Sequence, residues 1–128
     1  MAERLKIRSE GVWEDIVGYS RAIRVGKIIE VAGTTAMEGD AVIGENNVYE
    51  QTQFIFLRIK KALEQAGGRM EDIVRTRMYV TDISQWEQIA KAHSEIFKTI
   101  KPVATMVEVK RLIDEKLLIE IEVTAIVP

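Results

Sequence analysis

Charged side chains alternate with apolar ones in two segments of the sequence. Glu120 and Glu122 alternate with isoleucines in the run 118–122, and Arg75 and Arg77 are spaced by two within 73–80. Because successive side chains of a strand point to opposite faces, each segment predicts a strand with its charges on one face. Glu30, within another short apolar segment, is expected on the same face of the sheet.

Two interpretations of this charged face remain open. It is either solvated, with ion pairs that contribute about 0–1 kcal/mol each, or buried against another subunit as a polar interface with clefts between chains. The sequence pattern alone favours the solvated face.

The residue types exclude several kinds of site. The chain has no cysteine and one histidine, so disulfides and thiol catalysis are excluded, and neither a metal nor an organic cofactor is expected. His93 lies on the apolar stripe of a predicted helix, which predicts a packed, hydrogen-bonded structural histidine and argues against ribonuclease chemistry. Trp86 lies on the same stripe and is predicted to belong to the core.

Length and charge bound the class of protein. With 128 residues and a formal net charge of -2, residues 1–128 are expected to form one domain that binds neither nucleic acid nor membrane. The first six residues lack the apolar region of a secretory signal, and no apolar run is long enough to span a bilayer, so a cytoplasmic location is expected.

Two helices have capping signals at their predicted starts. Asn47 with Glu50 precedes the first helix, Gly67-Gly68 ends it, and Ser84 with Glu87 is predicted to cap the second. Residues at helical spacing form the two apolar stripes: Val48, Thr52, Ile55, Ile59, Ala62, Leu63 and Ala66 in the first helix, and Trp86, Ile89, Ala90, His93, Ile96, Phe97 and Ile100 in the second.

The remaining segments predict strands. They cover 19–24 and 28–32 with a turn at 25–27 between them, then 73–80, 103–109 and 118–126. In 73–80, Val74, Thr76, Met78 and Val80 are expected on one face, and Ile73, Arg75, Arg77 and Tyr79 on the other. The order β-β-β-α-β-α-β-β, which includes one further strand before the first helix without an assigned range, indicates an α+β protein with both helices on one face of a single sheet.

Several segments of the chain carry recognisable motifs: Gly18-Tyr19-Ser20-Arg21-Ala22-Ile23, Val31-Ala32-Gly33-Thr34, 74–82, 101–109 and 118–122. In this order they resemble the motifs of the Rid family (YjgF/YER057c/UK114, also described as endoribonuclease L-PSP). The closing segments resemble the family's Pro-Ala-Arg-Ser, Val-x-Val and Ile-Glu-Ile-Glu. The resemblance spans nearly the whole chain.

The resemblance implies a chorismate-mutase-like fold and a homotrimer with ligand clefts at the three subunit interfaces. Active members hydrolyse reactive enamines and imines to 2-keto acids and ammonia. An arginine holds the substrate carboxylate and a glutamate positions or activates water. By resemblance, Glu120 matches that glutamate, Tyr19 the tyrosine of the pocket, and Gly33, followed by Thr34, the segment whose backbone approaches the ligand.

The sequence departs from the family at two positions. Ala104 occupies the place of the arginine, and Met106 that of a small residue that is often cysteine. Arg21 or Arg77 is a candidate to replace the arginine, and the alternative is that each pairs with Glu120 or Glu122 at the interface. Ala104, Met106 and Glu120 are expected in one cleft.

Three functions follow from the resemblance. The leading hypothesis is hydrolysis of an enamine, imine or related intermediate other than the standard 2-imino acids. A non-catalytic ligand-binding or regulatory trimer is the alternative, and standard 2-iminobutanoate or 2-aminoacrylate deamination is the third. Each implies a small carbonyl- or imine-type metabolite as the partner.

Overall fold

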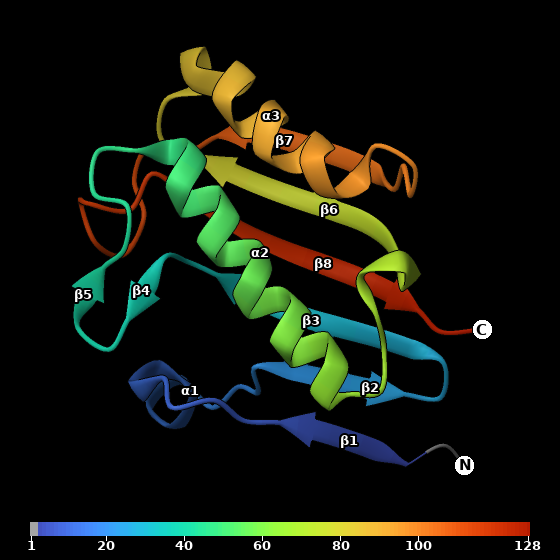
Figure 1. Cartoon of the computed structure of the whole chain (residues 1–128). Coiled ribbons are helices and arrows are strands. Elements are labelled where there is room, and N and C mark those ends of the chain that lie inside the picture. Colours follow the sequence, from blue (N-terminus) through green and yellow to red (C-terminus); the bar gives the residue numbers. More distant parts are fainter. Residues whose placement is uncertain (1–2) are drawn as a thin grey trace.

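Six strands form one mixed sheet with the spatial order β1-β2-β3-β8-β6-β7 (Figure 1). All neighbouring strands are antiparallel except β6 and β7, which are parallel. The computed structural model describes residues 3–128, so the first two residues of the segment considered for a signal lie outside the described residues. The strands are β1 (Arg4–Ile7), β2 (Ala22–Val25), β3 (Ile28–Thr34), β6 (Ile73–Val80), β7 (Val103–Glu108) and β8 (Ile119–Ile126).

Two long helices, α2 (Val48–Gln65) and α3 (Trp86–Phe97), cover one face of this sheet (Figure 1). The side chain of Asn47 accepts the first hydrogen bond of α2 from the backbone N–H of Glu50, as predicted. The helix ends at Gln65, and Gly67 follows with a φ of 85°, in the left-handed region that glycine adopts without strain. The apolar stripe predicted for α2 is buried along its whole length.

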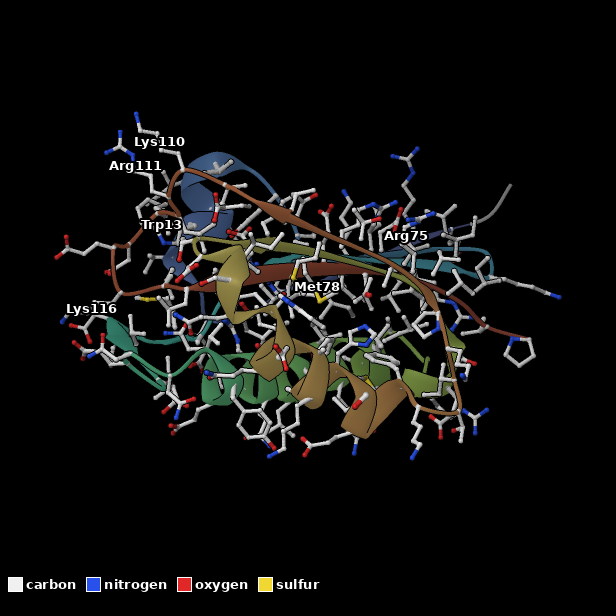
Figure 2. The ribbon with its side chains drawn as sticks, turned by 90° about the horizontal axis from the view of Figure 1, so that it is seen from above. Trp13, Arg75, Met78, Lys110, Arg111 and Lys116 are labelled. Atoms are coloured by element: carbon white, nitrogen blue, oxygen red, sulfur yellow. The ribbon has the colours of Figure 1, made fainter. Side chains whose placement is uncertain are left out.

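Strand β8 alternates between the two faces as its sequence predicts. Its buried side chains, Ile119, Ile121, Val123 and Ala125, pack beneath the helices at no more than 1% exposure. Glu120, Glu122 and Thr124 point to the opposite face, which we call the open face because neither α2 nor α3 covers it. Arg75 also points to the open face (Figure 2).

The face predicted for the start of β6 was wrong. Ile73 is buried at 2% exposure, whereas Val74 is 41% exposed. The pairing of β6 with β8 shifts register between Ile73 and Arg75. A bulge of this kind inserts one residue and reverses the alternation on its N-terminal side, while Thr76, Met78 and Val80 keep their predicted face.

The start of α3 also differs from the prediction. Asp82, not Ser84, accepts the capping hydrogen bond, from the backbone N–H of Ser84 at 3.0 Å. A 3₁₀ turn over Ile83–Gln85 then precedes the helix, so α3 begins at Trp86. Trp86 is 52% exposed and is not a core residue, because the helix reaches the sheet only one turn later, at Ile89.

Three short elements connect the main ones. Helix α1 (Val12–Val17) lies on the side of the sheet away from α2 and α3, where Trp13 is labelled (Figure 2). A small hairpin of β4 (Met37–Glu38) and β5 (Ala41–Val42) follows β3, and a 3₁₀ turn (Met70–Asp72) precedes β6. These elements were not predicted from the sequence.

Candidate functional site

A tight turn after α1 places Tyr19 and Arg21 beside the end of β3. Gly18 has a φ of 91°, and the backbone N–H groups of Gly18 and Tyr19 both donate to Glu14 O, at 2.9 and 3.0 Å. The left-handed conformation at Gly18 reverses the chain, so that Arg21 enters the sheet next to β3. Its backbone N–H donates to Ile7 O at 2.8 Å.

The guanidinium of Arg21 connects three residues of the predicted site. Its Nη1 donates to Gly33 O at 3.0 Å and to Thr34 Oγ1 at 2.8 Å. Its Nη2 donates to the hydroxyl of Tyr19 at 3.3 Å, and its carbon Cζ lies 5.6 Å from the centre of the Tyr19 ring. With 7% exposure, Arg21 is a buried cation that fixes the positions of Tyr19, Gly33 and Thr34.

Glu14 is the counter-ion of Arg21. Its carboxylate lies 3.8 Å from Arg21 Nε and is 3% exposed. Glu14 accepts hydrogen bonds from the backbone N–H of Ser9 at 3.0 Å and from the Ser9 hydroxyl. The Nε of Arg21 makes no hydrogen bond, because this separation is too long for one. The sequence analysis did not find Glu14, since the six residues between Gly11 and Gly18 are too few to show a recognisable pattern.

Glu120 lies directly over the backbone of Gly33. A Cβ atom at Gly33 would collide with the Glu120 carboxylate, so this position needs a glycine for close approach. Burial raises the pKa of the Glu120 carboxyl, the cation of Arg21 opposes this effect, and the nearby charge of Glu122 adds to it. The structure thus brings Tyr19, Arg21, Gly33, Thr34 and Glu120 together, and we call these five residues the Glu120 cluster.

Arg58 of α2 is a second cation near the Glu120 cluster. Its Nη1 donates to Thr35 O at 2.8 Å, one residue beyond the two that Arg21 contacts. Burial lowers the pKa of Arg58, and the positive charge of Arg21 lowers it further. The sequence analysis did not find Arg58, because a basic residue beside the apolar stripe of a helix looks like any other surface cation.

Arg77 belongs to a different group on the open face. Its Nε lies 4.0 Å from Glu122, and its Nη1 is 3.5 Å from the hydroxyl of Thr124. The hydroxyl of Tyr79 donates to Glu122 at 2.6 Å, and this hydrogen bond raises the pKa of Tyr79. Within one chain, Arg77 therefore pairs with Glu122 and does not join the Glu120 cluster.

Ala104 and Met106 lie on the side of the sheet that faces the helices. They pair with Thr76 and Met78 of β6, which point toward α2 and α3. Glu120 pairs with Tyr79 on the open face. One chain therefore does not bring Ala104 and Met106 together with Glu120, and a cleft that contains all three would need β7 from a second chain.

His93 is a packed residue with a polar partner, as predicted. Its Nε2 lies 2.9 Å from Thr76 Oγ1, and its ring centre is 5.8 Å from that of Phe56 and 4.5 Å from that of Phe97. Burial lowers its pKa. His93 lies between α3 and the sheet, on the opposite face from Glu120.

Residues 3–128 contain neither a candidate metal site nor a membrane-spanning helix. No group of three or more histidine, cysteine, aspartate or glutamate side chains there is placed to hold a metal ion. None of the helices in this part of the chain has the length and apolar composition needed to cross a bilayer.

The sheet order, the helix-covered face and the Glu120 cluster define an α+β protein with a chorismate-mutase-like fold. A family model described as Endoribonuclease L-PSP matches residues 13–127. An uncharacterized protein of Streptomyces coelicolor is 35% identical over 120 residues, which cover 94% of this chain and 90% of that protein. A RutC family protein of Pyrococcus abyssi is 37% identical over 84% of each chain.

Solved structures agree with these relatives. The crystal structure of Rv2704 from Mycobacterium tuberculosis, described as a member of the YjgF/YER057c/UK114 family, has a TM-score of 0.90 and 44% identity. It covers 98% of this chain and 100% of that chain. A Rid-family protein from Yersinia pestis has a TM-score of 0.86 and 30% identity, with 98% and 100% covered. The chain belongs to the Rid (YjgF/YER057c/UK114) family.

Proposed function

We propose that the chain forms a homotrimer that binds a small carbonyl- or imine-type metabolite in clefts between subunits. There it hydrolyses an enamine, imine or related reactive intermediate other than the standard 2-imino acids. The observation that carries this proposal is the Glu120 carboxylate, held over the backbone of Gly33 beside the buried cation of Arg21.

The proposed chemistry uses Glu120 as the base. Its carboxylate accepts a proton from water while the water oxygen attacks the imine carbon and the C=N electron pair moves to nitrogen. The protonated Glu120 gives this proton to the nitrogen, which yields a tetrahedral carbinolamine. Glu120 then moves the hydroxyl proton of the carbinolamine to the nitrogen as the C–N bond breaks, so imine plus water becomes carbonyl plus ammonia and the carboxylate is regenerated. A raised pKa suits this role, because proton transfer is most effective when the pKa of the base lies near the working pH. The Tyr19 hydroxyl and the Gly33-Thr34 backbone position the ligand.

The absence of a cation at position 104 argues against the standard substrates. A charge-assisted hydrogen bond contributes about 1.5–3 kcal/mol, so replacing a bidentate arginine by Ala104 costs about a hundredfold or more in binding a 2-imino acid. Met106 in place of a small residue also makes this part of the cleft narrower and more apolar. We therefore place the chain in a subgroup of the family without the arginine.

The open face of the sheet supports a trimer. It combines ion-pairing groups with apolar side chains that are 38–56% exposed in the single chain: Val25, Ile28, Val103, Val107 and Ile126. Apolar side chains gathered on a sheet face that α2 and α3 leave uncovered favour burial against another subunit over solvation. In such an assembly, β7 of one chain would supply the part of the cleft that the Glu120 cluster of another chain lacks.

Replacing the proposed base tests the hydrolysis. Glu120→Gln keeps the size of the side chain but removes the base, so ammonia release from enamines and imines should fall by about 10²-fold or more. The trimer mass measured by light scattering should not change. Glu122→Gln, on the same strand and face, is the matched control and should keep most of the activity. Full turnover in Glu120→Gln, or a monomer mass for the unmodified protein, would contradict the proposal.

A non-catalytic ligand-binding or regulatory trimer is the second candidate. The loss of the arginine at position 104 favours it, because that loss removes a group used to hold the substrate for reaction. It predicts that the ligand raises the melting temperature without turnover, and that affinity for a partner protein changes with ligand. The standard deaminase is the least favoured candidate, and rapid turnover of 2-iminobutanoate at low enzyme concentration would support it.

A further inference from the structure

Arg21 and Arg58 both donate hydrogen bonds to the segment 33–35, but their surroundings differ. Arg21 is buried, uses both Nη atoms within the chain and has Glu14 as its counter-ion. Its Nε and one N–H of Nη2 make no hydrogen bond, but the residue is only 7% exposed and offers a ligand little surface. Arg21 therefore holds the Glu120 cluster in place and is not free to grip a ligand.

Arg58 has donors to spare. Only its Nη1 is used, in the hydrogen bond to Thr35 O, and no other hydrogen bond or ion pair within residues 3–128 involves its guanidinium. The unused Nε and Nη2 lie on one edge of the guanidinium and form the two-pronged fork that matches a carboxylate. Arg58 is only half-buried, so this fork can be reached from outside.

Arg58 lies near one other cation and two acids. Burial and the cation of Arg21 disfavour the charged form of Arg58, whereas Glu14 and Glu38 favour it. Glu14 already accepts a hydrogen bond from Ser9 and pairs with Arg21. In the described part of the chain, Glu38 makes no ion pair with Arg58. A bound anion would relieve the repulsion between the two arginines.

We propose that Arg58 holds an anionic group of the ligand, with its Nε and Nη2 donating to a carboxylate. One end of the ligand binds Arg58 on α2, and the reacting carbon lies at Glu120, over Gly33. The ligand therefore passes Tyr19, and its carboxylate is several atoms away from the reacting carbon. The ligand class is then a carbonyl or imine compound with a distal carboxylate. This inference rests on the proposed function. It assigns to Arg58 of α2 the carboxylate-binding role of the arginine that is absent at position 104 of β7.

A pair of matched probes tests the role of Arg58. Calorimetric titration of the intact protein with 4-oxopentanoate and with its uncharged amide, 4-oxopentanamide, separates the carboxylate from the carbonyl. We expect the acid to bind about tenfold or more tightly than the amide. Arg58→Gln should abolish this preference without weakening the amide. Arg58→Lys, which keeps the charge but not the fork, should keep only part of it.

Lys60→Gln is the matched control, because it removes an exposed cation from the same helix and should keep the preference for the acid. An unmodified protein that binds neither probe, or binds both equally, would overturn the role of Arg58, as would Arg58→Gln with the preference intact. If Arg58→Gln does not fold, an undiminished preference in Arg58→Lys overturns the two-pronged grip. Enamine hydrolysis and its loss in Glu120→Gln, measured on the same preparations, report separately on the proposed function.

Discussion

At the scale of single residues, the Glu120 cluster depends on a few close approaches. Gly33 allows the Glu120 carboxylate to lie over its backbone, and Arg21 ties that backbone to Tyr19. The family motifs identified the members of this cluster from the sequence. The sequence analysis missed Glu14 and Arg58, which look like ordinary charged residues in the sequence and whose importance arises from contacts with other parts of the chain.

Adding one methyl group at Gly33 tests the close approach. In Gly33→Ala, the new Cβ would overlap the Glu120 carboxylate, which is the far end of a flexible side chain and can move. We expect the melting temperature to change little and the turnover to fall by about tenfold or more, because the base is displaced. Ala32→Gly, at the neighbouring position, serves as a control. Unchanged turnover in Gly33→Ala would show that the position of the carboxylate over residue 33 is not important.

At the scale of elements, helix α2 was predicted well because its signals are local. Asn47, the apolar stripe and the glycine pair all lie within the helix or next to it. The wrong predictions concern features that depend on a neighbouring strand or on which of two nearby residues forms a cap. The bulge at Ile73 requires β8, and Asp82 takes the cap that Ser84 was expected to provide. The short α1, bounded by Gly11 and Gly18, offered too few residues for a periodic signal.

The packing of α3 on the sheet makes stability depend on pH through His93. Burial lowers the pKa of His93 in the folded protein, so as the pH falls the unfolded chain takes up the proton first. The free energy of unfolding should therefore decrease below about pH 6.5, by at most about 1.4 kcal/mol per pH unit, until the folded-state pKa is reached. Chemical denaturation at fixed protein concentration measures this change. Gln in His93→Gln can still form a hydrogen bond with Thr76 but does not titrate, so the decrease in the free energy of unfolding should lack the contribution of His93. A pH dependence identical to that of the unmodified protein would contradict this role of His93.

At the scale of the whole molecule, one chain carries two parts of the proposed site and holds them apart. The Glu120 cluster lies where β2, β3 and β8 meet, whereas Ala104 and Met106 lie on β7, at the edge of the sheet and on its other face. The sequence could place these residues on strands but could not show that the strands separate them, because strand order and face depend on long-range pairing. An assembly that joins the two parts also explains the apolar side chains on the open face.

We propose that the Glu120 cluster can hydrolyse a 2-imino acid once an arginine on β7 holds the substrate carboxylate. Ammonia release from 2-iminobutanoate by Ala104→Arg, compared with the unmodified protein, is the measurement that tests this proposal. We expect a gain of about tenfold or more in Ala104→Arg that disappears when Glu120→Gln is added. No gain in a correctly assembled Ala104→Arg trimer, or a gain that survives Glu120→Gln, would contradict it.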